Sequence, residues 1–203
     1  MIGIVDYNMG NLRSVQNAFD KIGAKAVIEK KPENFKRYDK LVLPGVGAFG
    51  DAMEHLSEYG MDKAIKEFAK SGKPLLGICL GMQLLFEKSY EFGEHEGLGL
   101  IQGEVVPFDK SRFPKPLKVP HMGWNELFVQ KESSLFEGLP QAFYLYFVHS
   151  FHVECDDRFA IGKTLYGYEF VSAVQKENVF GLQPHPEKSH DNGLKILKNF
   201  VEM

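Results

Sequence analysis

The chain is poor in cysteine. It has only two cysteines among 203 residues, Cys79 and Cys155, and no C-x-x-C pair. A disulfide framework or a structural zinc site needs several such residues at close spacing, so neither is expected. Two isolated cysteines fit a reducing compartment, and we expect a cytoplasmic protein with free thiols and no bound metal.

The sequence also lacks long apolar runs, an excess of basic residues and a phosphate-binding glycine pattern. No stretch approaches the roughly 18 apolar residues of a membrane helix, and Ile2–Val5 is typical of a strand rather than of a signal peptide. The net charge is −3 and the isoelectric point is about 6.2. Neither a membrane nor a nucleic acid is therefore an expected partner, and no nucleotide or redox cofactor is expected.

The remaining composition is that of a folded globular domain. Hydrophobic residues make up 44% of the chain and charged residues 25%, close to globular averages. The length suits one domain over residues 1–203. In the first half, apolar runs alternate with segments of helical periodicity, which predicts a parallel sheet covered by helices. The expected strands are Ile2–Val5, Ala26–Ile28, Lys40–Leu43 and Pro74–Ile78, and the expected helices are Asn11–Ile22, Met53–Ala69, with a break considered at Gly60, and Leu80–Lys88.

The second half is richer in strand patterns. Valine, phenylalanine and tyrosine alternate between turn residues there, and the chain closes with a helix at Lys188–Val201. Together the halves predict one α/β domain whose central sheet is mixed but mostly parallel and is flanked by helices. The expected strands of this half are Leu98–Phe108, Trp124–Val129, Tyr144–Val153, Ala160–Leu165, Ser172–Gln175 and Val179–Gln183.

Residues 77–81, with the sequence GICLG, have the form G-x-C-x-G between an apolar strand and a helix. This is the cysteine form of the nucleophile elbow, a tight strand-to-helix turn that needs small flanking residues. A helix N-terminus favours a negatively charged sulfur, and the N–H of Leu80 can point at an oxyanion. We predict that Cys79 is a nucleophile. The alternative is a small buried apolar residue.

A candidate base follows the last predicted strand. His185 lies between two prolines, and Glu187 stands two positions later, on the same side of an extended segment. The carboxylate can hold the imidazole in one tautomer while the imidazole moves protons near neutral pH. We predict a Cys-His-Glu triad, although a plain loop in which Glu187 caps the next helix is an equal alternative.

These segments resemble the class I (triad-type) glutamine amidotransferases, and among them the glutaminase subunits of imidazole glycerol phosphate synthase. The resemblance spans nearly the whole chain. The elbow and the HPE segment are typical of the broad class. The PGVG and PHMGWN segments narrow the resemblance to the glutaminase subunits. The motifs are DYNMGNL at 6–12, LPGVGAF at 43–49, GICLGMQL at 77–84, PHMGWN at 120–125, YFVHS at 146–150 and HPEKS at 185–189.

The resemblance implies a flavodoxin-like amidotransferase fold and an enzyme that hydrolyses glutamine to glutamate and ammonia. It also implies a heterodimer with a cyclase (synthase) subunit that takes the ammonia. Cys79, His185 and Glu187 would be catalytic. By the same resemblance the oxyanion site is formed by Gly47 and Leu80, glutamine is held by Gln83, Glu91, His149 and Ser150, and the synthase partner is faced by Asn11, Met122, Trp124, Tyr146 and Lys188.

Some assignments stay open on the sequence. Trp124 and Tyr146 are equally well explained as core aromatics, His121 is expected in a loop without a catalytic role, and Cys155 is taken as structural. Pro184 stands where the family often has an aromatic residue, which leaves room for a subunit serving another synthase, such as a sugar-aminating one. The sequence is also compatible with a γ-glutamyl hydrolase-like enzyme or with a non-catalytic α/β scaffold.

Overall fold

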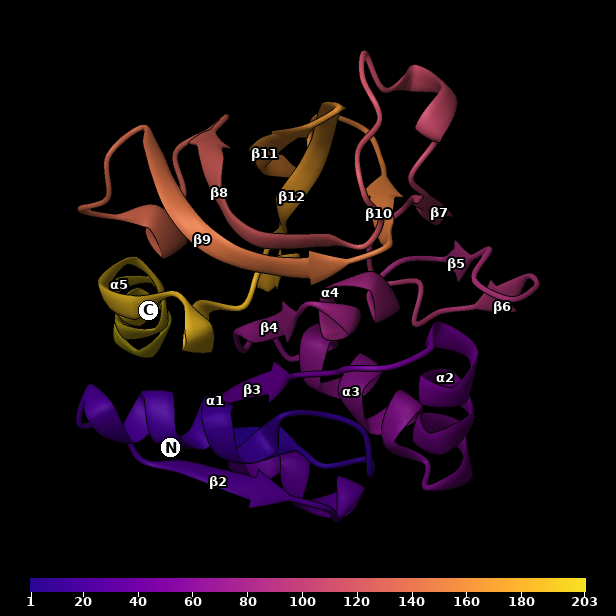
Figure 1. The fold of residues 1–203 in the computed structure, drawn as a ribbon. Helices are drawn as coiled ribbons and strands as arrows, with labels where there is room; N and C mark the ends of the chain where they lie inside the picture. The colour runs from indigo at the N-terminus through magenta and orange to yellow at the C-terminus, as the bar shows by residue number, and fades with distance from the viewer.

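One sheet of thirteen strands runs through the computed structural model, which describes all residues 1–203 (Figure 1). Its first half consists of five parallel strands in the order β2-β1-β3-β4-β13. Because all five run the same way, their carboxyl ends lie along one edge of the sheet. These strands are β1 (Ile2–Val5), β2 (Ala26–Glu29), β3 (Lys40–Leu43), β4 (Leu75–Ile78) and β13 (Val179–Leu182).

Helices cover both faces of this parallel half (Figure 1). On one face α1 (Leu12–Lys21) and α5 (His190–Glu202) share a buried core with Val42 of β3, and on the other α2 (Phe49–Glu58) and α3 (Met61–Lys70) share a core with Leu41 and Leu43. Successive strand residues point to opposite faces, so an uninterrupted apolar strand feeds both cores.

The second half of the sheet is largely antiparallel. Strand β13 pairs with β12, and the path continues through β10, β7, β5 and β6, while β11, β8 and β9 branch from β12. The long hairpin of β8 and β9 curves over the carboxyl edge of the parallel strands (Figure 1). The bounds are β5 (Lys88–Ser89), β6 (His95–Glu96), β7 (Glu104–Pro107), β8 (His121–Val129), β9 (Ala142–His149), β10 (Phe151–Glu154), β11 (Ala160–Tyr166) and β12 (Tyr168–Lys176).

The predicted fold class is confirmed, but some predicted elements are wrong. The break considered at Gly60 within Met53–Ala69 is confirmed, because two helices lie there and Gly60 adopts a left-handed conformation between them. The strand expected at Tyr144–Val153 is broken at Ser150 into β9 and β10. Short 3-10 segments that the periodicity did not indicate lie at Pro32–Arg37, Lys110–Arg112, Ser134–Phe136 and Pro186–Lys188.

Two further errors have one cause. The helix after the elbow, α4 (Leu80–Leu84), ends well before Lys88, and the strand expected from Leu98 begins only at Glu104. The N–H groups of residues 97–101 instead donate to the carbonyls of residues 84–87, with Leu98 N to Leu84 O at 2.8 Å. This long-range pairing takes the carbonyls that a longer α4 would have used.

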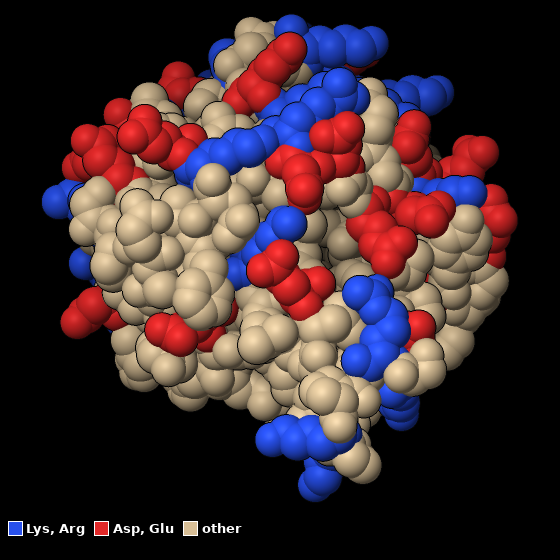
Figure 2. All heavy atoms as spheres, turned by 90° about the horizontal axis from the view of Figure 1, so that it is seen from above, with Lys and Arg blue, Asp and Glu red and all other residues tan.

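Charged side chains are mixed on the molecular surface. On the face drawn in Figure 2, lysine and arginine lie among aspartate and glutamate, and no large patch of one sign is formed. None of the helices has the length and apolar character that crossing a membrane would require.

The turn from β4 into α4 leaves no room for a β-carbon at either of its two glycines, Gly77 and Gly81. A β-carbon on Gly77 would lie 2.6 Å from the carbonyl oxygen of Gly81, and one on Gly81 would overlap the carbonyl oxygen of Leu43 in the neighbouring strand. Both clashes are with backbone, which cannot move aside as a side chain can. The two glycines therefore set how closely α4 approaches the sheet.

We expect Gly81→Ala to lower the free energy of unfolding by about 3 kcal/mol or more, because β3 and the elbow must separate. Gly23→Ala is the matched control: Gly23 has a φ of 74° and no atom within 4 Å of its would-be β-carbon, so only backbone strain of about 1–2 kcal/mol applies. Urea unfolding of both variants measures the difference. Equal losses would contradict the crowding argument.

Candidate active site

Three loops that leave the parallel strands meet at one edge of the sheet. Strand β3 runs into residues 44–48, β4 into Cys79 and β13 into His185. The register places Leu43 beside Gly77 and Ile78 beside Leu182. Segments more than 100 positions apart in the sequence are thus neighbours, at the edge where open α/β sheets bind their ligands.

Cys79 occupies a strained turn. Its φ is 54° and its ψ is −113°, in a region that side chains rarely adopt. The backbone N–H of Cys79 donates to Leu182 O at 2.7 Å, which ties the turn to β13. Helix α4 begins directly after it, so the N–H of Leu80 is among those that the helix itself cannot pair.

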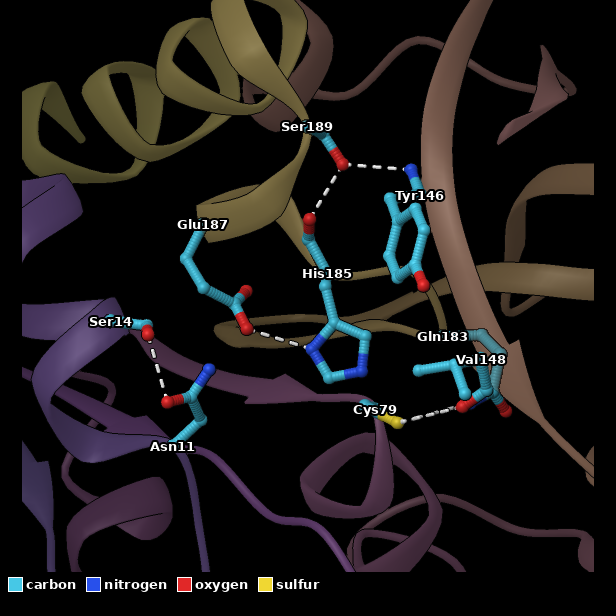
Figure 3. Close-up of polar contacts among 9 residues, drawn as sticks. All are labelled: Asn11, Ser14, Cys79, Tyr146, Val148, Gln183, His185, Glu187 and Ser189. Atoms are coloured by element: carbon cyan, nitrogen blue, oxygen red, sulfur yellow. Dashed lines mark hydrogen bonds and ion pairs between the residues drawn. The ribbon is translucent and has the colours of Figure 1, made fainter. Parts of the chain in front are cut away.

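His185 and Glu187 form a buried pair. Nδ1 of His185 lies 2.7 Å from Oε1 of Glu187, and the two side chains are 2% and 1% exposed. Figure 3 shows the imidazole between this carboxylate and the sulfur of Cys79. Since an ionised carboxylate only accepts, Nδ1 carries the proton, which leaves Nε2 free of any hydrogen bond within the chain. Nε2 is therefore the atom of His185 that is available for proton transfer.

The backbone around this pair is held by the β8–β9 hairpin. His185 N donates to Tyr146 O at 2.8 Å. The hydroxyl of Ser189 donates to His185 O at 2.5 Å and accepts from Tyr146 N at 2.9 Å (Figure 3). The His-Pro-Glu segment is therefore fixed to β9 before any ligand binds.

Opposing effects set the charge of His185. Burial lowers the pKa of this histidine, but attraction to Cys79 and to Glu187 outweighs burial and raises the pKa to about 10. The protonated form of His185 is therefore stabilised when a negatively charged sulfur of Cys79 lies beside it. The geometry and charge together are those of a nucleophile with a paired base.

The pocket above Cys79 has a volume of about 260 Å³. A larger hollow of about 410 Å³ lies near Ser134–Phe136, but no cysteine or histidine lines it. The residues expected to bind glutamine or its oxyanion all line the smaller pocket. Its lining is Val46, Gly47, Cys79, Leu80, Gln83, Glu91, Val148, His149, Ser150, Phe151 and His185.

The loop at residues 44–48 is anchored at both ends. The buried hydroxyl of Tyr7 donates to Pro44 O at 2.8 Å, and the carboxylate of Glu91 accepts from Phe49 N at 2.9 Å. Burial raises the pKa of Glu91. Between these anchors Gly47 has a φ of 109°, a conformation that glycine adopts freely.

The residues expected to face a partner lie outside the pocket. Met122 and Trp124 are 62% and 47% exposed, and Trp124 stacks on His190 with ring centroids 5.1 Å apart. The alternative of Trp124 as a core aromatic is therefore wrong. Tyr146 and Asn11 are partly buried, and Lys188 is exposed.

Two buried polar residues were given no role in the site on the sequence alone. Gln183 is fully buried, and its Nε2 lies 3.8 Å from Cys79 Sγ. His121, expected in a loop, is instead the buried first residue of β8 and hydrogen-bonds to His149. A glutamine two positions before the histidine was the available signal for Gln183. Nothing in the sequence pairs His121 with His149.

Known proteins match the chain from end to end. The glutamine amidotransferase class-I family model matches residues 3–203. The chain belongs to this family. Two relatives named imidazole glycerol phosphate synthase subunit HisH, from Sulfurimonas denitrificans and Wolinella succinogenes, are 71% and 64% identical over the whole chain, and the match covers 98% and 100% of them.

Solved structures agree on the fold of this amidotransferase. A structure titled as a glutamine amidotransferase superposes with a TM-score of 0.76 at 20% identity, over 99% of this chain and 97% of the other. PurLQS from Thermotoga maritima gives 0.77 at 21% identity, again over 99% and 97%. At such low identity the likeness concerns the fold alone.

The backbone of Cys79 predicts a difference in stability between two variants at this position. Cys79→Ala keeps a β-carbon at φ 54°, whereas Cys79→Gly releases the strain. We expect the glycine variant to be more stable to urea by about 1 kcal/mol, although glycine usually destabilises. A glycine variant less stable than the alanine variant would show that the turn is unstrained.

Two buried histidines predict a loss of stability in acid. Burial lowers the pKa of His121 to about 4 and the pKa of His149 well below its ordinary value. Both are neutral in the folded amidotransferase, so below the unfolded pKa of about 6.5 only the unfolded chain gains protons. The free energy of unfolding should therefore fall as the pH drops from about 6.5 toward about 4.

Urea unfolding at pH 7 and pH 5 measures this effect, with His121→Gln as the comparison, since glutamine cannot titrate. We expect the variant to lose about 2 kcal/mol less than the parent between the two pH values. Identical losses would mean that His121 is not held neutral in the folded state.

Proposed function

We propose that this chain is the glutaminase subunit of imidazole glycerol phosphate synthase, acting in histidine biosynthesis as one amidotransferase domain over residues 1–203. The observation that supports this proposal most directly is the pocket in which Cys79, on a strained elbow, faces a buried His185–Glu187 pair. The two relatives that are 71% and 64% identical over the whole chain support the pathway, since both carry that synthase's name.

The reaction begins at the sulfur. The thiolate of Cys79 attacks the side-chain carboxamide carbon of glutamine, and the carbonyl oxygen becomes an oxyanion. The N–H of Leu80 and the backbone of the loop at Gly47 are the donors on the pocket wall, and such a donor is worth about 2.7–4 kcal/mol in comparable sites.

Collapse of this intermediate releases ammonia. Nε2 of His185 gives the proton that it took from the Cys79 thiol to the departing nitrogen, which leaves a glutamyl thioester on Cys79. Nε2 of His185 then takes a proton from a water molecule that attacks the thioester carbonyl, the carbon–sulfur bond breaks, and glutamate leaves with the Cys79 thiolate restored. Glu187 holds Nδ1 throughout. Every step uses only side chains and backbone groups of this chain.

The remaining pocket residues hold the substrate. Glu91 offers a carboxylate to the ammonium group of glutamine. His149 is neutral, as its lowered pKa indicates, and lines the pocket with Ser150 and Gln83. These assignments follow the family resemblance, and the shared pocket supports them.

Ammonia must reach a second active site without entering bulk water, where it would be protonated and lost. The exposed side chains of Met122 and Trp124 on β8 provide an apolar surface on which a cyclase subunit can seal the exit. We place the heterodimer interface at Asn11, Met122, Trp124, Tyr146 and Lys188. A complex of this kind works in the cytoplasm.

We expect glutamine hydrolysis to be low in the isolated chain and to rise when the cyclase subunit and its acceptor substrate are added. The physical reason is the glycine at position 47, whose backbone can rotate to supply or withdraw an oxyanion donor. Glutamate release, measured with and without each component, tests this. Equal rates in the free and bound states would contradict the switch.

The variant Cys79→Ala distinguishes the glutaminase activity from the synthase activity of the complex. In the complex it should lower glutamine-dependent synthesis by about 10⁴-fold or more, while synthesis from added ammonium salt continues unchanged. Failure with this cyclase but activation by a sugar-aminating synthase would reassign the pathway. Hydrolysis of γ-glutamyl peptides by the chain alone would point to a hydrolase instead.

A further inference from the structure

A single backbone carbonyl under the active site accepts hydrogen bonds from two side chains. The carbonyl of Phe151 lies 3.2 Å from Nε2 of Gln83 and 2.8 Å from Nδ1 of His149. It sits where the chain passes from β9 to β10. Because a carbonyl can only accept, both of these nitrogens must carry hydrogen, which fixes the orientation of both side chains.

The first branch leads to the nucleophile. Nε2 of Gln83 also donates to Oε1 of Gln183 at 3.0 Å. With its oxygen held there, Gln183 turns its own Nε2 toward Cys79 Sγ, 3.8 Å away. Gln83 and Gln183 are both buried. The sulfur thus faces an amide donor whose direction is set two hydrogen bonds away.

The opposite amide orientation is excluded within this network. If Gln183 were turned over, its nitrogen would face the nitrogen of Gln83, donor against donor. Turning Gln83 as well would place its oxygen against the carbonyl oxygen of Phe151, acceptor against acceptor. Only the arrangement that presents a donor to the sulfur satisfies every buried group.

The second branch leads from the same carbonyl to His149, and the proton directions along it can be deduced from its far end. Nδ2 of Asn125 donates to Leu165 O at 2.9 Å, and its Oδ1 accepts from Glu126 N at 2.8 Å. The nitrogen therefore also faces Nε2 of His121, at 3.1 Å, and that atom must accept. It follows that Nδ1 of His121 carries the proton.

That proton points at His149. Nδ1 of His121 lies 2.9 Å from Nε2 of His149, which must accept it, so the proton of His149 is on Nδ1 and faces Phe151 O. The direction deduced from Asn125 agrees with the direction deduced from the carbonyl. Burial, which lowers the pKa of both histidines, keeps them in these neutral tautomers.

We propose that Gln183 is a positioning residue for Cys79: its amide, oriented through Gln83 by the carbonyl of Phe151, donates to the sulfur and stabilises its charged form. The inference deepens the proposed glutaminase function and rests on it. The donor acts against a second contact of the sulfur, since Cys79 Sγ also lies 3.8 Å from Val148 O (Figure 3). That carbonyl accepts from the thiol and favours the neutral form. Gln183 favours the thiolate.

Alkylation of Cys79 by iodoacetamide tests the proposal, because only the thiolate reacts. The measurement uses the complex with the cyclase subunit, in a Cys155→Ala background that leaves Cys79 as the one cysteine of this chain, and alkylation is followed on the Cys79 peptide. Gln183→Met keeps the side-chain length and removes the donor. We expect its alkylation at neutral pH to be about tenfold slower, equivalent to ~1.4 kcal/mol, and the midpoint of the pH profile to move upward. A profile that coincides with the parent's would overturn the proposal.

Three further variants complete the design. Gln183→Glu has nearly the same shape but repels a sulfur anion, so it should move the midpoint upward even if the methionine variant fails to fold; an unmoved midpoint would count against the proposal. Gln83→Met should act through Gln183, and the double variant should show no additional shift. Asn199→Leu removes another buried amide, one that bonds Leu135 O and Glu137 O, and should leave the profile unchanged.

Alkylation rates do not depend on turnover. Alkylation needs no glutamine, so an inactive complex with a shifted Gln183→Met profile would refute the proposed function and leave this inference standing. An active complex in which the Gln183→Met profile is unshifted would overturn this inference and leave the proposed function standing. A shift of equal size in Asn199→Leu would show general loosening of the fold and would also overturn the role of Gln183.

Discussion

The active site depends on the parallel pairing of β3, β4 and β13. Parallel strands in register bring their carboxyl ends to one edge, and here that edge carries the loop at residues 44–48, the elbow at Cys79 and the histidine segment. No direct sequence proximity links the last two. A one-residue slip of β13 against β4 would turn its alternating side chains to the opposite faces of the sheet. Because both faces are buried against helices, the register is strongly specified.

The parallel half of the fold was predictable because its signals are local. Short apolar strands, amphipathic helices and the glycines of the elbow each report their own conformation. Where the prediction was wrong, long-range pairing decided the structure. The segment 97–101 ends α4 by taking its carbonyls, and the break at Ser150 divides what the sequence presents as one strand. Neither event leaves a mark in composition or periodicity.

The same distinction holds within the site. Cys79, His185 and the residues expected to bind glutamine or its oxyanion line one pocket, because their motifs end at one sheet edge. Gln183 and His121 escaped notice because their importance comes from what they touch across the sheet. An amide or an imidazole in a strand has no pattern of its own, and its meaning appears only when burial obliges every donor and acceptor to find a partner.

The break between β9 and β10 connects these observations. A continuous strand would direct successive backbone carbonyls into ladder hydrogen bonds with neighbouring strands. On either side of the break, the carbonyls of Val148 in β9 and Phe151 in β10 accept from the sulfur, from Gln83 and from His149. The irregularity therefore places backbone acceptors under the pocket without leaving them unpaired. Backbone carbonyls therefore orient the side chains around Cys79, and this orientation is established before any substrate arrives.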